Sequence, residues 1–245
     1  NARRLGLTGS RFGNANGWPD EGRTYVTARD LATLARAEIE NHPRLYKQFY
    51  SRPSFTWGKT LGSGQAITQG NRNPLLGRVP GADGLKTGHT EEAGYGFTGS
   101  AEQNGRRLIM VVAGLTSASQ RIEESVKLMQ WGFNAWQTKP LFKKGATVGS
   151  AEVQMGGDDE VALVAPRDLA VTIPAGVLSK VSGMKIRYDG PLKAPIAKGQ
   201  HVADLIVTTS ATGEQSMPLV AAEAVGEAGF FARAWIGLKQ LFGMA

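Results

Sequence analysis

The sequence has 245 residues, of which 41% are hydrophobic and 20% charged, so it can bury a core and is not intrinsically disordered. The formal net charge of +7 comes from scattered lysines and arginines, so we expect a solvated basic surface and no nucleic-acid partner. The chain has no cysteine, and its three histidines lack zinc-ligand spacing, which excludes disulfides and thiolate chemistry and predicts no metal or cofactor.

The first predicted element is a helix after a glycine-rich loop over residues 1–26. Thr27 and Asp30 have the spacing of an N-terminal capping signature, in which the threonine side chain accepts a bond from the third helical amide. The apolar residues that follow recur at helical spacing: Leu31, Leu34, Ala35 and Ile39. We therefore predict a helix that begins near Ala28.

Three strands are predicted next. Residues 85–87 have the pattern of a strand end, and 95–101 and 107–115 flank the pair Asn104-Gly105. Asn-Gly between two apolar runs is the strongest short-range signal for a β-hairpin. Antiparallel pairing of 95–101 with 107–115 is therefore expected.

A second amphipathic helix is predicted to start near Ser117 or Ser119 and to continue until Pro140 and the turn at 143–145. Its apolar stripe has the spacing of a helix face and consists of Ile122, Val126, Met129, Phe133 and Trp136. A run of strands between two helices over residues 1–140 thus indicates an α+β domain.

The remaining sequence has a different texture. Five short β segments, 161–164, 169–173, 184–188, 201–207 and 217–221, are separated by turn signals and predict a small β-rich domain over 141–229. Residues 230–245 place large apolar groups on one arc of a helix, with Arg233 and Lys239 on the other. This segment is too short to span a bilayer, so it either lies in a membrane interface or docks on the protein's own core.

The strongest chemical signal is the run 83–90, which contains Lys86-Thr87-Gly88 after an Asp-Gly turn. An edge strand of this composition suits acyl-serine chemistry. The ammonium and the hydroxyl can bind the carboxylate of a peptide or a β-lactam, and the backbone can pair with an extended substrate. The glycine lets a ligand approach the strand closely.

These residues resemble a known family. Lys86-Thr87-Gly88 is similar to the third motif of the penicillin-recognising serine enzymes. The longer run 84–90 with Ala93-Gly94-Tyr95 resembles the low-molecular-mass D-alanyl-D-alanine carboxypeptidases, serine peptidases of family S11. The same family is resembled by two upstream runs, 25–31 and 69–76, and by one downstream run, Trp131-Gly132-Phe133. The resemblance implies the C-terminal part of a β-lactamase/transpeptidase-like domain with an antiparallel sheet and flanking helices, then a small β domain and an anchoring helix.

The same resemblance implies roles for six residues. Lys86, Thr87 and Gly88 would form the catalytic strand that binds substrate, and His89 would lie beside the site. Arg121, at the start of the second helix, would bind near the terminal carboxylate of D-Ala-D-Ala. Arg72 would be another arginine of the active site.

Two further motifs of the family are absent. The first, Ser-x-x-Lys, supplies the nucleophile and its activating lysine, and the second is Ser-x-Asn. The literal match Ser182-Gly-Met-Lys185 follows the Lys-Thr-Gly motif and lies in the β-rich part, so we reject it. We expect both motifs in a segment before Asn1, which would be a partner of this chain. The chain alone would then be inactive.

The resemblance implies a serine-type D-Ala-D-Ala carboxypeptidase that acts on peptidoglycan stem peptides and is acylated by β-lactam antibiotics. Its expected place is the periplasmic face of the bacterial inner membrane, bound peripherally through Phe230–Ala245. Two alternatives stay open. One is a non-catalytic envelope protein that binds peptidoglycan or a partner on the same fold, and the other is a β-lactamase.

Overall fold

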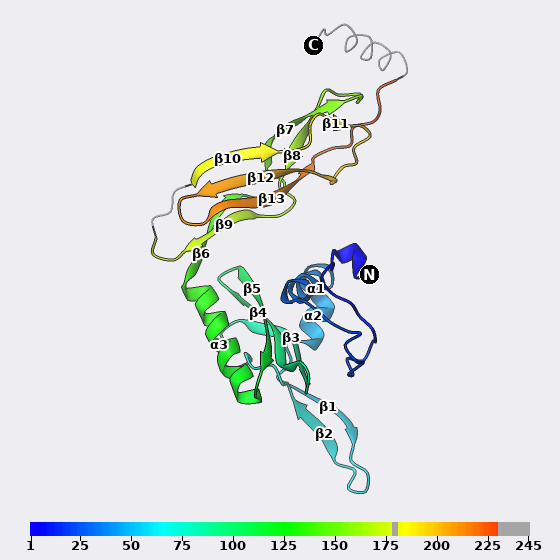
Figure 1. The fold of residues 1–245 in the computed structure, drawn as a ribbon, viewed down its shortest axis with the longest axis vertical. Coiled ribbons are helices and arrows are strands. Elements are labelled where there is room, and N and C mark those ends of the chain that lie inside the picture. Colours follow the sequence, from blue (N-terminus) through cyan, green and yellow to red (C-terminus); the bar gives the residue numbers. More distant parts are fainter. Residues whose placement is uncertain (178–180, 230–245) are drawn as a thin grey trace. The chain divides into compact units, whose positions relative to one another are not determined.

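The chain forms two compact units in a computed structural model that describes residues 1–177 and 181–229 (Figure 1). The first unit is Asn1–Ala135, and the second begins at Trp136. The amphipathic segment expected at Phe230–Ala245 lies outside the described residues. Among the residues that are described, no helix is long and apolar enough to cross a lipid bilayer.

The first unit is built on a three-stranded antiparallel sheet in the order β3-β4-β5. Its elements in chain order are a 3-10 turn (Arg3–Leu5), α1 (Ala28–Asn41), α2 (Pro43–Phe49), β1 (Ser54–Lys59), β2 (Ala66–Gly70), β3 (Ala82–Thr90), β4 (Gly94–Gln103), β5 (Arg106–Leu115) and α3 (Ala118–Asn134). Helices α1 and α2 lie on one side of the sheet and α3 on the other (Figure 1).

Each face of this sheet carries a buried apolar cluster, because side chains that alternate along its strands point to opposite faces. On the α3 side, Phe97, Met110 and Met129 pack with Leu75 and other apolar residues. On the α1–α2 side, the cluster contains Ala35, Tyr46 and Leu85, with Ile109 packed against it. Neighbouring residues of β5 thus serve opposite faces of the sheet.

The capping and hairpin predictions are confirmed. The side chain of Thr27 accepts a hydrogen bond of 3.1 Å from the amide of Asp30, and α1 begins at Ala28. Asn104 and Gly105 both have positive φ, +51° and +74°, as a tight hairpin turn between β4 and β5 requires. A second hairpin, β1–β2, was not predicted, and its residues are mostly exposed.

The predicted end of the second helix is wrong. Helix α3 starts at Ala118, capped by Ser117, but it ends at Asn134, so Trp136 does not belong to its apolar stripe. Trp136 instead opens strand β6 (Trp136–Phe142), which pairs with β9. Pro140 lies within β6 next to a register shift, where a strand tolerates a residue that has no N–H.

The second unit consists of β6 and further strands. They are β7 (Thr147–Gln154), β8 (Glu160–Val164), β9 (Leu169–Pro174), β10 (Val181–Arg187), β11 (Leu192–Lys193), β12 (His201–Thr209) and β13 (Gly213–Ala221). A six-stranded sheet has the order β10-β12-β13-β8-β7-β11, and β6 pairs with β9. All five predicted β segments are strands, whereas β6, β7 and β11 were missed.

The rejected Ser-x-x-Lys match lies on strand β10. The hydroxyl of Ser182 donates to the carbonyl of Thr208, and the ammonium of Lys185 lies 3.0 Å from Glu214. A catalytic Ser-x-x-Lys opens a helix, which places its lysine one turn from the serine on the same face, whereas this pair lies on a strand and bonds to different partners. The rejection is confirmed.

Candidate active site

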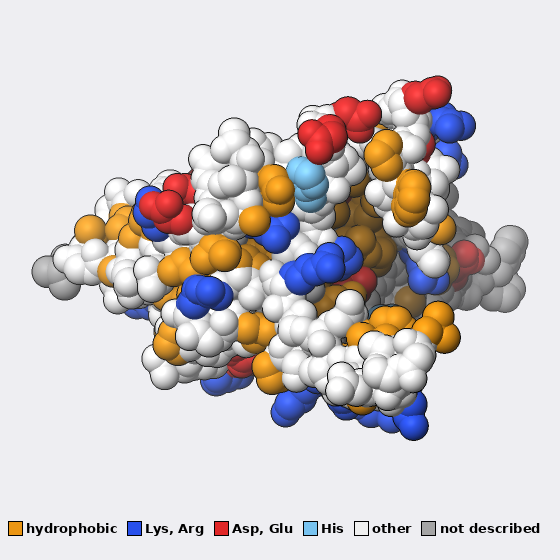
Figure 2. All heavy atoms as spheres, turned by 90° about the horizontal axis from the view of Figure 1, so that it is seen from below, with side chains coloured by type: hydrophobic (Ala, Val, Ile, Leu, Met, Phe, Trp, Pro, Cys, Tyr) orange, Lys and Arg blue, Asp and Glu red, His pale blue; other side chains and the backbone are white. Residues whose placement is uncertain are grey.

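A groove of about 960 Å³ opens in the first unit along strand β3. On this side of the molecule, Figure 2 shows hydrophobic side chains deep in a hollow and Lys, Arg and His side chains beside it. All six residues singled out from the sequence line the groove, namely Arg72, Lys86, Thr87, Gly88, His89 and Arg121. They come from a loop, a strand and a helix that are separate in the sequence.

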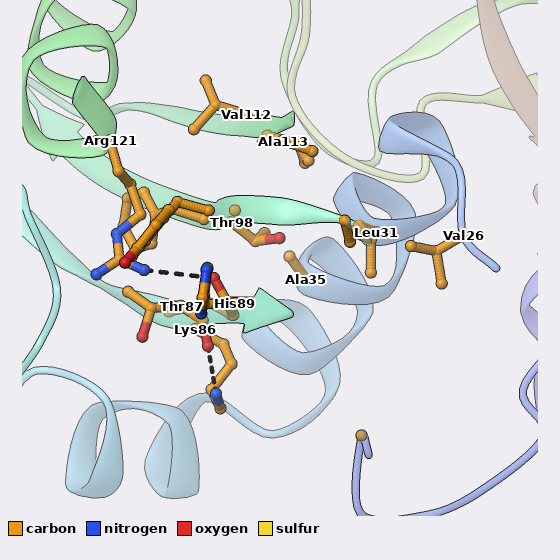
Figure 3. Close-up of a pocket in the computed structure, with 18 of the residues that line it drawn as sticks. Val26, Leu31, Ala35, Lys86, Thr87, His89, Thr98, Val112, Ala113 and Arg121 are labelled. Atoms are coloured by element: carbon orange, nitrogen blue, oxygen red, sulfur yellow. Dashed lines mark hydrogen bonds between the residues drawn. The ribbon is translucent and has the colours of Figure 1, made fainter. Parts of the chain in front are cut away.

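Strand β3 carries four of the six residues and lies at an edge of its sheet, since within the described chain it pairs only with β4. Lys86 and His89 are exposed, and Thr87 is half-buried. The ammonium of Lys86 donates to the carbonyl of Thr87 (Figure 3). The backbone on the open side of β3 is therefore positioned to pair with an extended ligand.

Gly88 has no structural reason to be glycine. Its φ is not positive, and a Cβ placed on it would meet no atom within 4 Å. Gly84 differs, because a Cβ there would lie 2.2 Å from the hydroxyl of Tyr46. The space beside Gly88 is open on the groove side, which is what a ligand in close contact with the strand requires.

Arg121 reaches β3 from the first turn of α3 (Figure 3). Its Nη1 donates to the carbonyl of Gly88 over 3.3 Å, and its guanidinium lies 5.4 Å from the ring centre of Tyr95. The Nε of Arg121 is buried and has no hydrogen-bond partner among the described residues. A guanidinium in this state retains N–H groups for a carboxylate.

Arg72 projects from the loop between β2 and β3, and its two neighbours hold that loop. The side-chain amide of Asn71 donates to the carbonyls of Tyr50 and Arg52 at 3.1 and 2.8 Å. The side chain of Asn73 is buried and donates to the carbonyl of Gly84 at 2.8 Å. These bonds fix the backbone on both sides of Arg72.

Three groove residues received no role from the sequence. The hydroxyl of Tyr50 donates to Glu38 over 3.1 Å, and burial together with this carboxylate raises the pKa of Tyr50. Tyr95 lies directly opposite His89 across β3 and β4, with 3.9 Å between ring centres. The short turn after Thr90 is the signal from which the pair of His89 and Tyr95 could have been found, whereas nothing in the sequence singles out Glu38.

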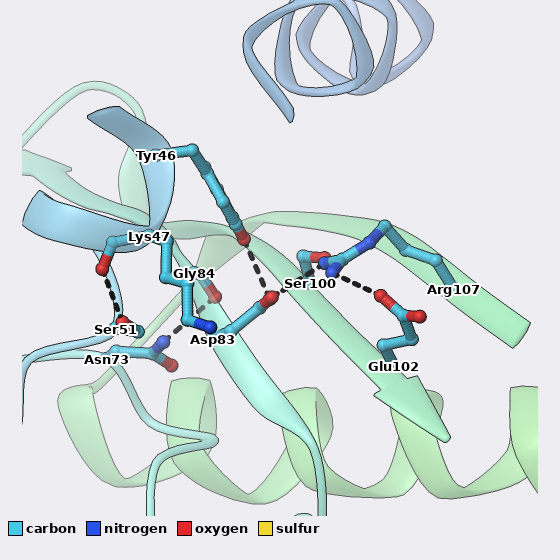
Figure 4. A network of polar contacts seen from close by, with 9 residues as sticks. All are labelled: Tyr46, Lys47, Ser51, Asn73, Asp83, Gly84, Ser100, Glu102 and Arg107. Atoms are coloured by element: carbon cyan, nitrogen blue, oxygen red, sulfur yellow. Dashed lines mark hydrogen bonds and ion pairs between the residues drawn. The ribbon is translucent and has the colours of Figure 1, made fainter. Parts of the chain in front are cut away.

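A polar network lies at the start of β3, next to the motif (Figure 4). The carboxylate of Asp83 accepts from the hydroxyl of Tyr46 at 2.7 Å and pairs with Arg107 at 2.8 Å. Arg107 also donates to Ser100 and to Glu102, at 2.7 and 2.6 Å. Burial, reinforced by the bond to Asp83, raises the pKa of Tyr46. The network fixes β3 to α2, β4 and β5 just before Lys86.

The groove is suited to an extended peptide that ends in a carboxylate. Three cationic side chains, those of Arg72, Lys86 and Arg121, line it beside an open strand edge. No serine is among the described residues that line it. No group of three His, Asp or Glu side chains that could hold a metal ion occurs in the part of the chain that the structure describes.

Comparisons with known proteins agree with this geometry. Residues 1–117 match the family described as D-alanyl-D-alanine carboxypeptidase, and residues 136–227 match the penicillin-binding protein 5 C-terminal domain. The chain is 37% identical over 235 residues to D-alanyl-D-alanine carboxypeptidase DacC of Escherichia coli, a match that covers 96% of this chain and 56% of the relative. It is 36% identical to DacA of Haemophilus influenzae, covering 95% of this chain and 58% of that one.

A solved structure, penicillin binding protein 5 from Haemophilus influenzae, is also similar. It matches with a TM-score of 0.69 and 35% identity over 92% of this chain and 64% of its own. The chain thus spans a little more than half the length of the curated relatives that it matches. Over the two matched stretches, this chain belongs to the D-alanyl-D-alanine carboxypeptidase family and carries the C-terminal domain of penicillin-binding protein 5.

Proposed function

We propose that the protein acts as a serine-type D-Ala-D-Ala carboxypeptidase on peptidoglycan stem peptides. The names of its relatives, D-alanyl-D-alanine carboxypeptidase and penicillin binding protein 5, support this reaction. The observation that carries the proposal is the open edge of β3, where Gly88 leaves free space beside Lys86 and Thr87. β-Lactams would occupy the same place as substrate mimics.

The reaction proceeds through an acyl-enzyme. A serine hydroxyl adds to the carbonyl of the penultimate D-Ala, the peptide C–N bond breaks, and the nitrogen takes up a proton and leaves as D-Ala. Water then hydrolyses the ester. In this scheme Thr87 and Lys86 bind the substrate carboxylate together with Arg121, Arg72 lines the same groove, and the backbone of β3 pairs with the peptide. His89 stands at the rim of the site.

The nucleophile of this scheme comes from outside residues 1–245. Ser-x-x-Lys occurs once in the sequence, at Ser182–Lys185, and there it lies on a strand of the second unit. A binding strand without a nucleophile would not hydrolyse a peptide. The activity is therefore assigned to the product of the complete reading frame, with this chain supplying the substrate-binding strand.

The deciding experiment is intact mass spectrometry of that complete product with and without benzylpenicillin, together with an assay for released D-Ala. We expect a stable gain of the drug's mass and release of D-Ala from an acyl-Lys-D-Ala-D-Ala peptide. The absence of both the drug adduct and released D-Ala would favour the non-catalytic envelope protein. Rapid turnover of penicillin would favour the β-lactamase.

Gly88→Ala tests the strand itself. Because the added methyl group points into open space, the fold should be unchanged, whereas a ligand on β3 would be displaced. Acylation should slow roughly ten- to a hundred-fold. Gly183→Ala is the matched control: it lies on β10, its φ is not positive, and a Cβ there also meets nothing within 4 Å. Equal acylation of Gly88→Ala and the wild type would remove β3 from the site.

We also propose attachment to the periplasmic face of the inner membrane through Phe230–Ala245. Its support is the sequence of this segment, which would place large apolar groups on one arc of a helix and has only basic residues among its charges. Cosedimentation with vesicles of anionic lipid tests it, in comparison with a protein that ends at Gly229. Equal binding by the two proteins would contradict the proposal.

A further inference from the structure

The aromatic ring of Tyr95 contacts two of the groove's candidate ligand-binding residues at once. Its ring centre lies 3.9 Å from that of His89, directly across the strand pair. The guanidinium carbon of Arg121 lies 5.4 Å from the same ring centre. Both partners line the groove, and so does Tyr95 itself.

The backbone holds Tyr95 in place at the end of the β3–β4 hairpin. Between Tyr95 and Phe97 the pairing of β4 with β5 shifts register, from Tyr95↔Leu115 to Phe97↔Val112. Gly114, within this shift, has a φ of +72°. Such bulges re-aim a side chain without breaking the sheet. Here the irregular pairing occurs at the residue whose ring meets Arg121.

Arg121 has few other contacts that could hold it. Among the described residues its side chain makes one hydrogen bond, from Nη1 to the carbonyl of Gly88, which is long at 3.3 Å, and its buried Nε has no hydrogen-bond partner. A long, flexible arginine side chain loses much rotational freedom when it is held in one position. An aromatic face attracts a cation without using any of its N–H groups.

We propose that Tyr95 is a positioning residue, whose ring holds the guanidinium of Arg121 at the rim of the groove and leaves terminal N–H groups of the guanidinium for the carboxylate of the substrate. This assignment rests on the proposed function, because it takes Arg121 as the group that binds that carboxylate. The hydroxyl of Tyr95 plays no part in it. Only the face of the ring matters, so phenylalanine at position 95 should hold Arg121 as well as tyrosine does.

The kinetic test uses the product of the complete reading frame with an acyl-Lys-D-Ala-D-Ala peptide. Tyr95→Leu, which removes the ring, should lower kcat/KM about ten-fold, mainly through KM. Tyr95→Phe should stay within about two-fold of the wild type. In an Arg121→Ala background, Tyr95→Leu should cause no further loss, because Tyr95 acts through the side chain that is already gone.

A second readout does not depend on activity. The Nε–H signal of Arg121 in an NMR spectrum should carry a ring-current shift, which Tyr95→Phe preserves and Tyr95→Leu abolishes. The inference is overturned if Tyr95→Leu leaves this signal unchanged, or if it lowers kcat/KM equally with and without Arg121. Failure of the proposed function looks different, since the wild type would then release no D-Ala while the NMR signal still decides whether Tyr95 positions Arg121.

Discussion

Arg107, on β5, joins polar side chains from two other strands at the start of the candidate substrate strand. It pairs with Asp83 on β3 and donates to Ser100 and Glu102 on β4. We expect Arg107→Met to lower the free energy of unfolding by about 2 kcal/mol, because Asp83 and Ser100 lose a shared partner away from water. Urea denaturation followed by circular dichroism measures this loss.

The control for Arg107 is its more exposed partner. The side chain of Glu102 is 46% exposed, against 23% for Asp83. Glu102→Gln should therefore cost less than about 1 kcal/mol, as for other exposed ion pairs. Equal losses in the two variants would show that the pair Asp83–Arg107 is not the centre of the network.

Tyr46 makes the free energy of unfolding depend on pH in the alkaline range. Its pKa is raised in the folded protein, first by burial and then by its bond to Asp83, so the folded state favours the neutral phenol. This contribution is complete below the unfolded pKa of about 10 and is lost as pH rises above it. Between pH 8 and 11 the wild type should lose about 1 kcal/mol more than Tyr46→Phe. If the free energies of unfolding of the two proteins differed by the same amount at pH 8 and at pH 11, this mechanism would be contradicted.

Single residues of the groove could be named from the sequence where a local motif carried them. Lys86, Thr87, Gly88 and His89 are consecutive, and Arg72 lies in a run that resembles the same family. Arg121 was singled out because the family implies a basic residue at the start of helix α3. Their roles stay predictions. Glu38 could not be named, because its place in the groove depends on how α1 packs on the sheet.

Elements were predicted wherever period and turn chemistry agreed. The hairpin around Asn104 and the capped start of α1 satisfy both criteria, and both were found. The β1–β2 hairpin was missed because its residues are largely exposed and only Phe55 and Trp57 give β1 an alternating pattern, which is too short to predict a strand. Trp136 was assigned to α3 because helical spacing extends past Asn134 by chance, while pairing with β9 decides its true place.

Strand β8 contributes two of the fully buried side chains of the second unit. Leu163 and Val161 are fully buried and alternate with half-buried residues. Leu163→Ala should lower the free energy of unfolding by about 2–5 kcal/mol, because it leaves a cavity in a packed core. Met184→Ala, on the edge strand β10, removes a side chain that is 55% exposed and should change it by less than about 0.5 kcal/mol. Thermal denaturation of both variants measures the difference.

At the scale of the whole molecule, the change of texture near residue 140 predicts two domains with separate cores. The domain boundaries at 140 and 229 stay predictions. The two compact units of the structure divide the chain between Ala135 and Trp136. In the described chain, the large apolar cluster of the second unit lies entirely between Leu141 and Val225. The first unit instead divides its apolar residues between two smaller clusters, one on each face of its sheet.

We therefore expect residues 136–229 to fold when expressed alone. Each member of its core finds its partners inside the segment, and β6 finds β9 there too. The isolated segment should unfold in one cooperative transition, and its amide NMR spectrum should be well dispersed. Its midpoint in urea should match one transition of the 245-residue chain. A collapsed segment without cooperative unfolding would mean that the β domain needs residues 1–135, and that the two units form one folding unit.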